Sequence, residues 1–149
     1  EKVIAIGNDC PDLTTAHIQT AITQLDHQSL VLGPTLDGGD YLIGIQKTNF
    51  DASQFSALPW NSKNVHEELM NMADNLGLHV MCLQTLMDID NIQSIKKYLQ
   101  LNPNTFFASA ITQLLCWFLE LSKSGAVTTK SIFLSSCQFL RPPPLLNLR

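Results

Sequence analysis

Short apolar runs, each followed by an acidic loop, constrain the fold of this chain more than any other feature. Three of them lie at residues 2–6, 29–33 and 78–83. All three are predicted to be strands, and the short, β-branched run at 2–6 is predicted to be a buried one. Between the runs, apolar residues recur at the spacing of one helix face. Because strands and helices alternate, we expect an α/β domain with a largely parallel sheet.

The first half of the chain divides into readily predicted elements. Thr14 favours the N-cap of a helix, and the apolar face of that helix consists of Ile18, Ala21, Ile22 and Leu25. A further strand is expected at residues 41–45, after a loop with paired glycines. Residues 50–61 are expected to be irregular.

The second half begins with a helix predicted from Lys63 to Leu76. Asn64 with Glu67 resembles a capping box, and Gly77 suits the position just past the helix end. After the strand at 78–83, a last amphipathic helix is expected. Its inward residues are predicted to be Ile92, Ile95, Tyr98 and Leu99.

The composition argues against several functions. The 149 residues include 9 Lys or Arg and 13 Asp or Glu, for a net charge of −4. The basic residues are scattered, so we expect no nucleic-acid binding. An acidic protein handles phosphates more readily through a divalent cation. The four cysteines lack zinc-ligand spacing, so we expect free thiols in a reducing compartment, the cytoplasm.

A change of character after Leu101 predicts two domains, residues 1–101 and residues 102–149. Residues 106–121 are strongly apolar but fewer than the ~20 needed to cross a bilayer, so we expect a packing helix rather than a membrane span. The Pro-rich stretch at 142–144 is expected to be irregular.

The acidic residues of the first two loops each have two interpretations. Asp12 is explained by helix entry, where the helix dipole is positive, whereas Asp9 suits either that role or ligand binding. Asp37 and Gly38 are typical of a tight hairpin turn. The glycine pair also lets a ligand approach backbone N–H groups closely.

The third acidic loop contains Asp88 and Asp90, which lie on one side if the segment is extended. Such a pair can hold a divalent ion that clamps a diphosphate; alternatively, Asp90 or Asn91 caps the last helix. Because ligands bind at the carboxyl ends of strands, we expect all three acidic loops at one sheet edge. Trp60 suits stacking on a sugar or base, or a place in the core.

Taken in order, the pieces are GNDCPDLT before a helix, LGPTLDGGDYLIG, LPWNS, GLHV and DID. Over residues 1 to about 100, this set resembles the bacterial glycosyltransferase-like family of radical-SAM/selenodomain-associated transferases, whose members are linked to arsenosugar biosynthesis. That family is similar to the GT-A nucleotide-diphospho-sugar transferases and to the guanylyltransferases of molybdenum-cofactor and phospholactate pathways. The resemblance implies a three-layer α/β fold with a mostly parallel sheet.

The resemblance also implies the roles of individual residues. Asp37 matches the D-G-G loop near the acceptor and is the candidate catalytic base. The expected ligands of a Mg²⁺ or Mn²⁺ ion are Asp9, Asp88 and Asp90. The expected substrate-binding residues are Asn8, Gly38, Gly39 and Trp60.

The chain departs from the family at several points. Asn8 stands where Ser or Thr is usual, Asp40 where an aromatic residue is usual, and Asn91 begins a sequence that differs from the usual T-P-E-D-L. The family's N-terminal strand and basic, glycine-containing nucleotide loop are also missing. We therefore expect the chain to correspond to the C-terminal portion of a GT-A-like domain.

The function implied is transfer of a glycosyl group from a nucleotide diphosphate-sugar to a small acceptor, assisted by a divalent cation. One alternative is a guanylyltransferase-like nucleotidyltransferase on the same fold. The other is a non-catalytic fragment of such an enzyme.

Overall fold

The computed structural model describes residues 1–60 and 62–123. By its internal contacts the chain divides into two compact units, Glu1–Leu101 and Asn102–Arg149, and each is described by itself. The Pro-rich stretch at 142–144 lies outside the described residues.

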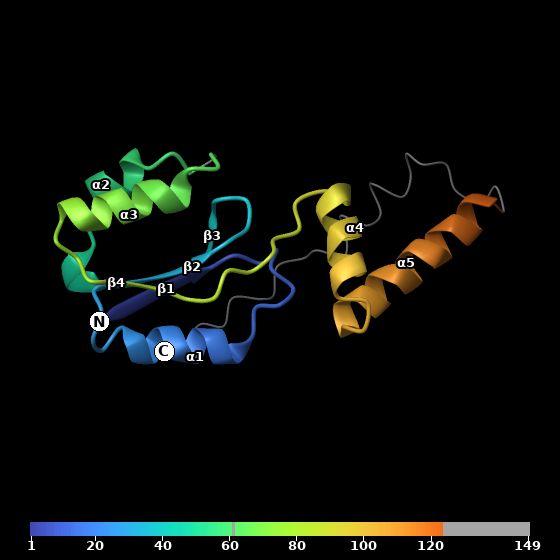
Figure 1. The fold of residues 1–149 in the computed structure, drawn as a ribbon, viewed down its shortest axis with the longest axis horizontal. Helices are drawn as coiled ribbons and strands as arrows, with labels where there is room; N and C mark the ends of the chain where they lie inside the picture. Colours follow the sequence, from blue (N-terminus) through green and yellow to red (C-terminus); the bar gives the residue numbers. More distant parts are fainter. Residues whose placement is uncertain (61, 124–149) are drawn as a thin grey trace, which may run out of the picture. The chain divides into compact units, whose positions relative to one another are not determined.

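The first unit is built on a four-stranded sheet in the order β1-β3-β2-β4. Helices cover both faces of this sheet (Figure 1). The α/β class with helices on two faces is therefore confirmed. The strands are β1 (Lys2–Ile6), β2 (Leu30–Pro34), β3 (Asp40–Gln46) and β4 (Val80–Cys82).

The strand directions correct the expectation of a mostly parallel sheet. β3 runs antiparallel to both β1 and β2, and only β4 pairs in parallel, with β2. The reason is local: the loop between β2 and β3 turns the chain directly back, and so short a connection joins antiparallel neighbours. β1, β2 and β4 nevertheless run in the same direction, so their carboxyl ends meet at one edge.

Helices α1 and α3 form where the apolar spacing predicts them. Thr14 is the N-cap of α1, and its backbone N–H donates to Nδ1 of His17 (3.1 Å). Asn64 is the N-cap of α3, but its side chain makes no capping hydrogen bond, so the predicted capping box is wrong. Gly77 follows α3 with φ 63°. The helices of the first unit are α1 (Thr15–Gln24), α2 (Ala52–Ala57), α3 (Val65–Asn75) and α4 (Ile92–Leu101), with a short 3₁₀ turn at Lys47–Asn49.

Helix α2 corrects the expectation of an irregular segment at residues 50–61. Asp51 is its N-cap, and its carboxylate accepts hydrogen bonds from the backbone N–H groups of Ser53 (2.8 Å) and Gln54 (3.3 Å). An acidic N-cap of this kind satisfies amide donors that a helix start leaves unpaired. The Asp-x-Ser signal was present in the sequence.

Two apolar clusters lie on opposite faces of the sheet. On one face, Leu25, the C-cap of α1, packs with Val31 and Leu42. On the other, Leu69 of α3 packs with Leu30 and Leu32. Because neighbouring β2 residues alternate between the two clusters, the central strand is buried on both sides. The sheet thus forms the middle of three layers.

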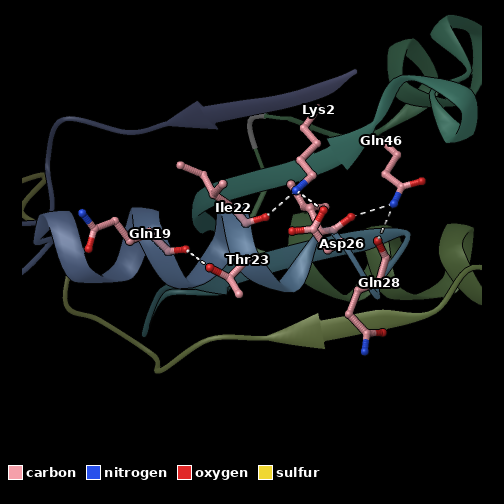
Figure 2. A network of polar contacts seen from close by, with 8 residues as sticks. Lys2, Gln19, Ile22, Thr23, Asp26, Gln28 and Gln46 are labelled. Carbon is pink, nitrogen blue, oxygen red and sulfur yellow. Dashed lines mark hydrogen bonds and ion pairs between the residues drawn. The ribbon is translucent and has the colours of Figure 1, made fainter.

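Polar contacts fasten α1 to the sheet (Figure 2). The ammonium of Lys2 donates to the Ile22 carbonyl (2.8 Å) and to the Asp26 carboxylate (2.7 Å). From β3, the side-chain amide of Gln46 donates to the Leu25 carbonyl (2.6 Å). The bonds to Ile22 and Leu25 occupy backbone carbonyl groups at the end of α1 that no N–H of the helix can reach.

Strand β1 is an edge strand, not the buried strand expected. Four of its five residues are exposed, and Val3 and Ile6 keep 51% and 53% of their surface accessible. An apolar run indicates a strand, but it does not indicate whether the strand pairs on one side or on both. The edge position of β1 could therefore not be predicted from the sequence pattern.

Helix α4 is tied to the loop after β1. The hydroxyl of Tyr98 donates to the Asp12 carboxylate (2.5 Å), so Asp12 serves this contact rather than helix entry alone. Tyr98 is buried, as expected, whereas Ile92 is 66% exposed, contrary to its predicted inward position. Ile92 starts the helix, where the apolar stripe has less to pack against.

In the second unit the structure describes residues 102–123, which include α5 (Phe106–Lys123). The hydroxyl of Thr105 accepts a hydrogen bond from the Ala108 N–H (3.2 Å) near the helix start. Among the described residues, no helix has the length and apolar character needed to cross a membrane.

Candidate functional site

The loops that follow β1, β2 and β4 line one cavity of about 620 Å³, together with the segment that leads into α3. This gathering follows from the shared direction of the three strands. Five acidic residues line the cavity, and they are Asp9, Asp37, Asp40, Asp88 and Asp90. The segment before and within the first turn of α3 contributes Trp60, Ser62, Lys63 and Val65.

Asp37, Asp88 and Asp90 form a triad in this cavity. Each offers a carboxylate oxygen, and these oxygens lie within 4.8 Å of one another. Three hard oxygen donors converging in this way suit Mg²⁺ or Mn²⁺, which bind carboxylates and keep other positions for water and phosphate oxygens. The triad could therefore hold a divalent cation.

Asp37 is held in place by its own loop. Its Oδ1 accepts hydrogen bonds from the Thr35 hydroxyl (2.7 Å) and the Gly39 N–H (3.2 Å). The Thr35 hydrogen bond, above all, lowers the pKa of Asp37 from its ordinary value. The β2–β3 turn thus presents an ionised carboxylate that is fixed by hydrogen bonds from its own loop.

Asp88 shows the opposite electrostatic effect. Burial, and then the charges of Asp37 and Asp90, raise the pKa of Asp88 to about 6. Carboxylates this close repel one another, and an opposite charge between them would favour their ionised forms.

Asp90 is available to the triad because another residue caps α4. The side-chain oxygen of Asn91 accepts from the backbone N–H groups of Gln93 (2.9 Å) and Ser94 (3.0 Å). Of the two capping residues considered from the sequence, Asn91 performs the task.

Asp9 lines the cavity but is not part of the triad. Its backbone carbonyl accepts a hydrogen bond from the Ile89 N–H (2.9 Å), which ties the loop after β1 to the D-I-D segment. The structure therefore groups Asp37, rather than Asp9, with Asp88 and Asp90. Asn8 and Gly38 are not among the residues that line the cavity, whereas Gly39 is.

Cys10, next to Asp9, is poorly suited to act as a nucleophile. Its side chain is buried, and burial together with the charges of Asp9, Asp88 and Asp37 raises the pKa of the thiol to about 12. A thiol that stays protonated at neutral pH is a poor nucleophile.

Gly38 joins the β2–β3 turn to the start of α3. It has φ 99°, and a Cβ at this position would overlap the carbonyl oxygen of Lys63. Its own carbonyl accepts a hydrogen bond from the His66 N–H (3.0 Å). Only glycine fits both the backbone conformation and this close approach.

Asp40 and His66 form a second link between the same segments. Nδ1 of His66 lies 3.0 Å and 3.2 Å from the two carboxylate oxygens of Asp40, whose side chain has no exposed surface. Burial raises the pKa of Asp40 to about 6, and the His66 hydrogen bond opposes this effect. The sequence marked Asp40 as unusual but did not reveal its partner.

Trp60 lines the cavity with 46% of its surface exposed, so the alternative of a core tryptophan is wrong. Its indole N–H donates to the Phe55 carbonyl (2.8 Å), and its ring stacks on Phe55 with centroids 6.3 Å apart. Lys63 also lines the cavity. No sequence pattern marked it as a candidate site residue, although it follows the Trp60 motif closely.

Comparisons with known proteins found similarity over part of the chain. Residues 1–62 match a bacterial family described as "uncharacterized protein conserved in bacteria (DUF2064)". A search of curated proteins found no match. A crystal structure from Desulfovibrio desulfuricans, described as a "putative nucleotide-diphospho-sugar transferase", superimposes with a TM-score of 0.65 and 29% sequence identity.

That alignment covers 72% of this chain and 46% of the Desulfovibrio protein, so this chain spans less than half of the length of its structural neighbour. The family match includes β1, β2, β3 and the first two acidic loops. The chain is therefore similar, in fold and in sequence, to part of this Desulfovibrio protein.

Proposed function

We propose that this chain binds a nucleotide diphosphate-sugar through a divalent cation and takes part in transferring its glycosyl group to a small acceptor. The observation that carries the proposal is the triad of Asp37, Asp88 and Asp90 in a cavity at the carboxyl ends of three strands. The likeness to the Desulfovibrio protein supports a nucleotide-sugar as the donor. The narrower resemblance to the radical-SAM/selenodomain-associated transferases remains part of this proposal.

In this proposal the triad residues are the cation ligands. A bound Mg²⁺ or Mn²⁺ would neutralise the diphosphate as it leaves. Asp37 and Asp90 present exposed carboxylates, while Asp88 is half-buried between them.

In this proposal Asp9 and Asp37 exchange the roles that the family resemblance implied. Asp37 becomes a cation ligand, and Asp9 becomes the candidate base. Asp37 lies in the triad and is held by two hydrogen bonds from its own turn, which suits a ligand. Asp9 lines the same cavity outside the triad, so we assign it to the acceptor side, where a carboxylate can accept a proton from an acceptor hydroxyl.

The other substrate contacts come from two segments. The exposed ring of Trp60 offers a stacking surface for a sugar or base. Gly39 brings backbone close to the cavity. Gly38 contributes indirectly, by fixing the turn that carries Asp37, whereas Asn8 does not line the cavity.

The test is binding and turnover of a panel of nucleotide diphosphate-sugars by the full chain, with and without Mn²⁺. We expect Mn²⁺-dependent binding that Asp90→Asn weakens at least tenfold and that the exposed Asp74→Asn leaves unchanged. Release of a nucleoside diphosphate indicates glycosyl transfer, and release of pyrophosphate indicates the nucleotidyltransferase alternative. Absence of cation-dependent binding would contradict the proposal.

A further inference from the structure

Lys63 is the one positively charged residue among the described residues that line the cavity. Its side chain is exposed, and no described carboxylate forms an ion pair with it, although five acidic residues line the same cavity. The ion pairs among the described residues involve Lys2, Lys47 and His66 instead. The ammonium of Lys63 is thus available to a ligand.

The backbone of Lys63 is fixed relative to the acidic loops. Its carbonyl oxygen occupies the space left by the missing Cβ of Gly38, one residue from Asp37. The Ser62 N–H donates to the Pro59 carbonyl (2.9 Å), and the Asn64 N–H donates to the Ser62 hydroxyl (3.2 Å). These contacts hold the base of the lysine side chain beside the turn that carries Asp37.

The cavity therefore places the negatively charged triad and the positively charged Lys63 in its lining. The carboxylates of the triad attract a cation, and a cation alone would gain nothing from a neighbouring ammonium, because like charges repel. A ligand that carries its own negative charges, coordinates the cation and reaches the lysine would satisfy both. A diphosphate has this charge pattern, with oxygens for the cation and others for a hydrogen bond from Lys63.

We propose that Lys63 binds a phosphate oxygen of the donor diphosphate while the triad holds the cation that bridges it. This inference rests on the proposed function, since it names a residue that recognises the same donor.

The experiment uses inorganic pyrophosphate as the probe, because it carries the diphosphate without a base or sugar. Mn²⁺ binding is measured first, by electron paramagnetic resonance, and pyrophosphate binding at saturating Mn²⁺ is then measured by calorimetry. We expect Lys63→Gln to weaken pyrophosphate binding about tenfold or more and to leave Mn²⁺ affinity equal or tighter. Lys63→Arg should retain most of the affinity.

Lys96→Gln is the matched control, because Lys96 is exposed on α4 and does not line the cavity. It makes the same change of charge and should bind pyrophosphate as the unmodified chain does. If Lys63→Gln and Lys96→Gln behave alike while Mn²⁺-pyrophosphate still binds, the role of Lys63 is wrong and the proposed function stands. If Lys63→Gln weakens Mn²⁺ binding as much as pyrophosphate binding, its role is structural and the inference is overturned.

If the unmodified chain binds Mn²⁺ but no pyrophosphate, the inference is also overturned. Failure of Mn²⁺ to bind at all would contradict the proposed function itself. The order of the two measurements therefore separates the two failures.

Discussion

Gly38 is the residue on which the geometry of the candidate site depends most. It permits the positive φ of the β2–β3 turn, accepts the His66 N–H, and leaves room for the Lys63 carbonyl. The sequence showed a glycine pair and suggested either a hairpin turn or close ligand approach. The structure shows that the chain's own backbone makes the close approach, a long-range contact that local sequence cannot encode.

Gly38→Ala should therefore destabilise the fold more than the same change at Gly77. Both glycines have positive φ, but the space around a Cβ at Gly77 is open. We expect about 1 kcal/mol for Gly77→Ala from backbone conformation alone, and about 2–4 kcal/mol for Gly38→Ala because the overlap with Lys63 adds to it. Urea denaturation of both variants measures the difference, and equal losses of stability would contradict the contact.

Asp40 should make stability depend on pH. Burial raises its pKa in the folded protein to about 6, from 3.8 for the unperturbed group, so folding favours the protonated form. The stabilising contribution of this group is complete below about pH 4 and is lost as pH rises through about 6. A shift of about two units corresponds to roughly 3 kcal/mol.

Asp40→Asn removes this titration and keeps an acceptor for His66. The variant should gain stability relative to the unmodified chain as pH rises from 4 to 7, with a plateau above the pKa of Asp40. Thermal or urea denaturation across this pH range measures it. The exposed Asp74→Asn provides the baseline, and a stability difference that stays flat with pH would show that Asp40 is not held in a desolvated site.

At the scale of elements, the sequence predicted most helices and strands but not every relationship between them. Apolar spacing located α1 and α3 because each has one buried face, and Thr14 and Gly77 marked helix ends. The Asp37-Gly38 pair did indicate a hairpin turn as one of two interpretations, and β2 and β3 form that hairpin. The sheet type was nevertheless predicted wrongly, since strand direction depends on pairing with distant residues. For the same reason the sequence could not show that β1 lies at an edge.

The packing of α3 on the sheet gives a prediction at this scale. Leu69 is fully buried against Leu30 and Leu32, whereas its neighbour Met70 is 38% exposed. Leu69→Ala should lower the free energy of unfolding by about 2–5 kcal/mol, and Met70→Ala by much less. Urea denaturation compares the two, and similar losses would show that α3 does not cover this face as described.

At the scale of the whole molecule, the candidate site arises from the common direction of β1, β2 and β4. Their three following loops converge although β3 runs the other way, so the gathering of acidic residues was predictable while the sheet type was not. The composition of the triad was not predictable, because which of Asp9 and Asp37 joins Asp88 and Asp90 depends on loop geometry. The sequence also did not mark Lys63 as a candidate site residue, because a single lysine forms no recognisable motif.

The central claim is that Asp37, Asp88 and Asp90 together hold a divalent cation. Its most direct test is Mn²⁺ titration of the full chain, followed by electron paramagnetic resonance, in the unmodified protein and in single Asp→Asn variants. The account predicts Mn²⁺ binding that Asp37→Asn, Asp88→Asn and Asp90→Asn each weaken at least tenfold, and that Asp9→Asn and Asp74→Asn leave nearly unchanged. Binding that is lost with Asp9→Asn but kept with Asp37→Asn would contradict it.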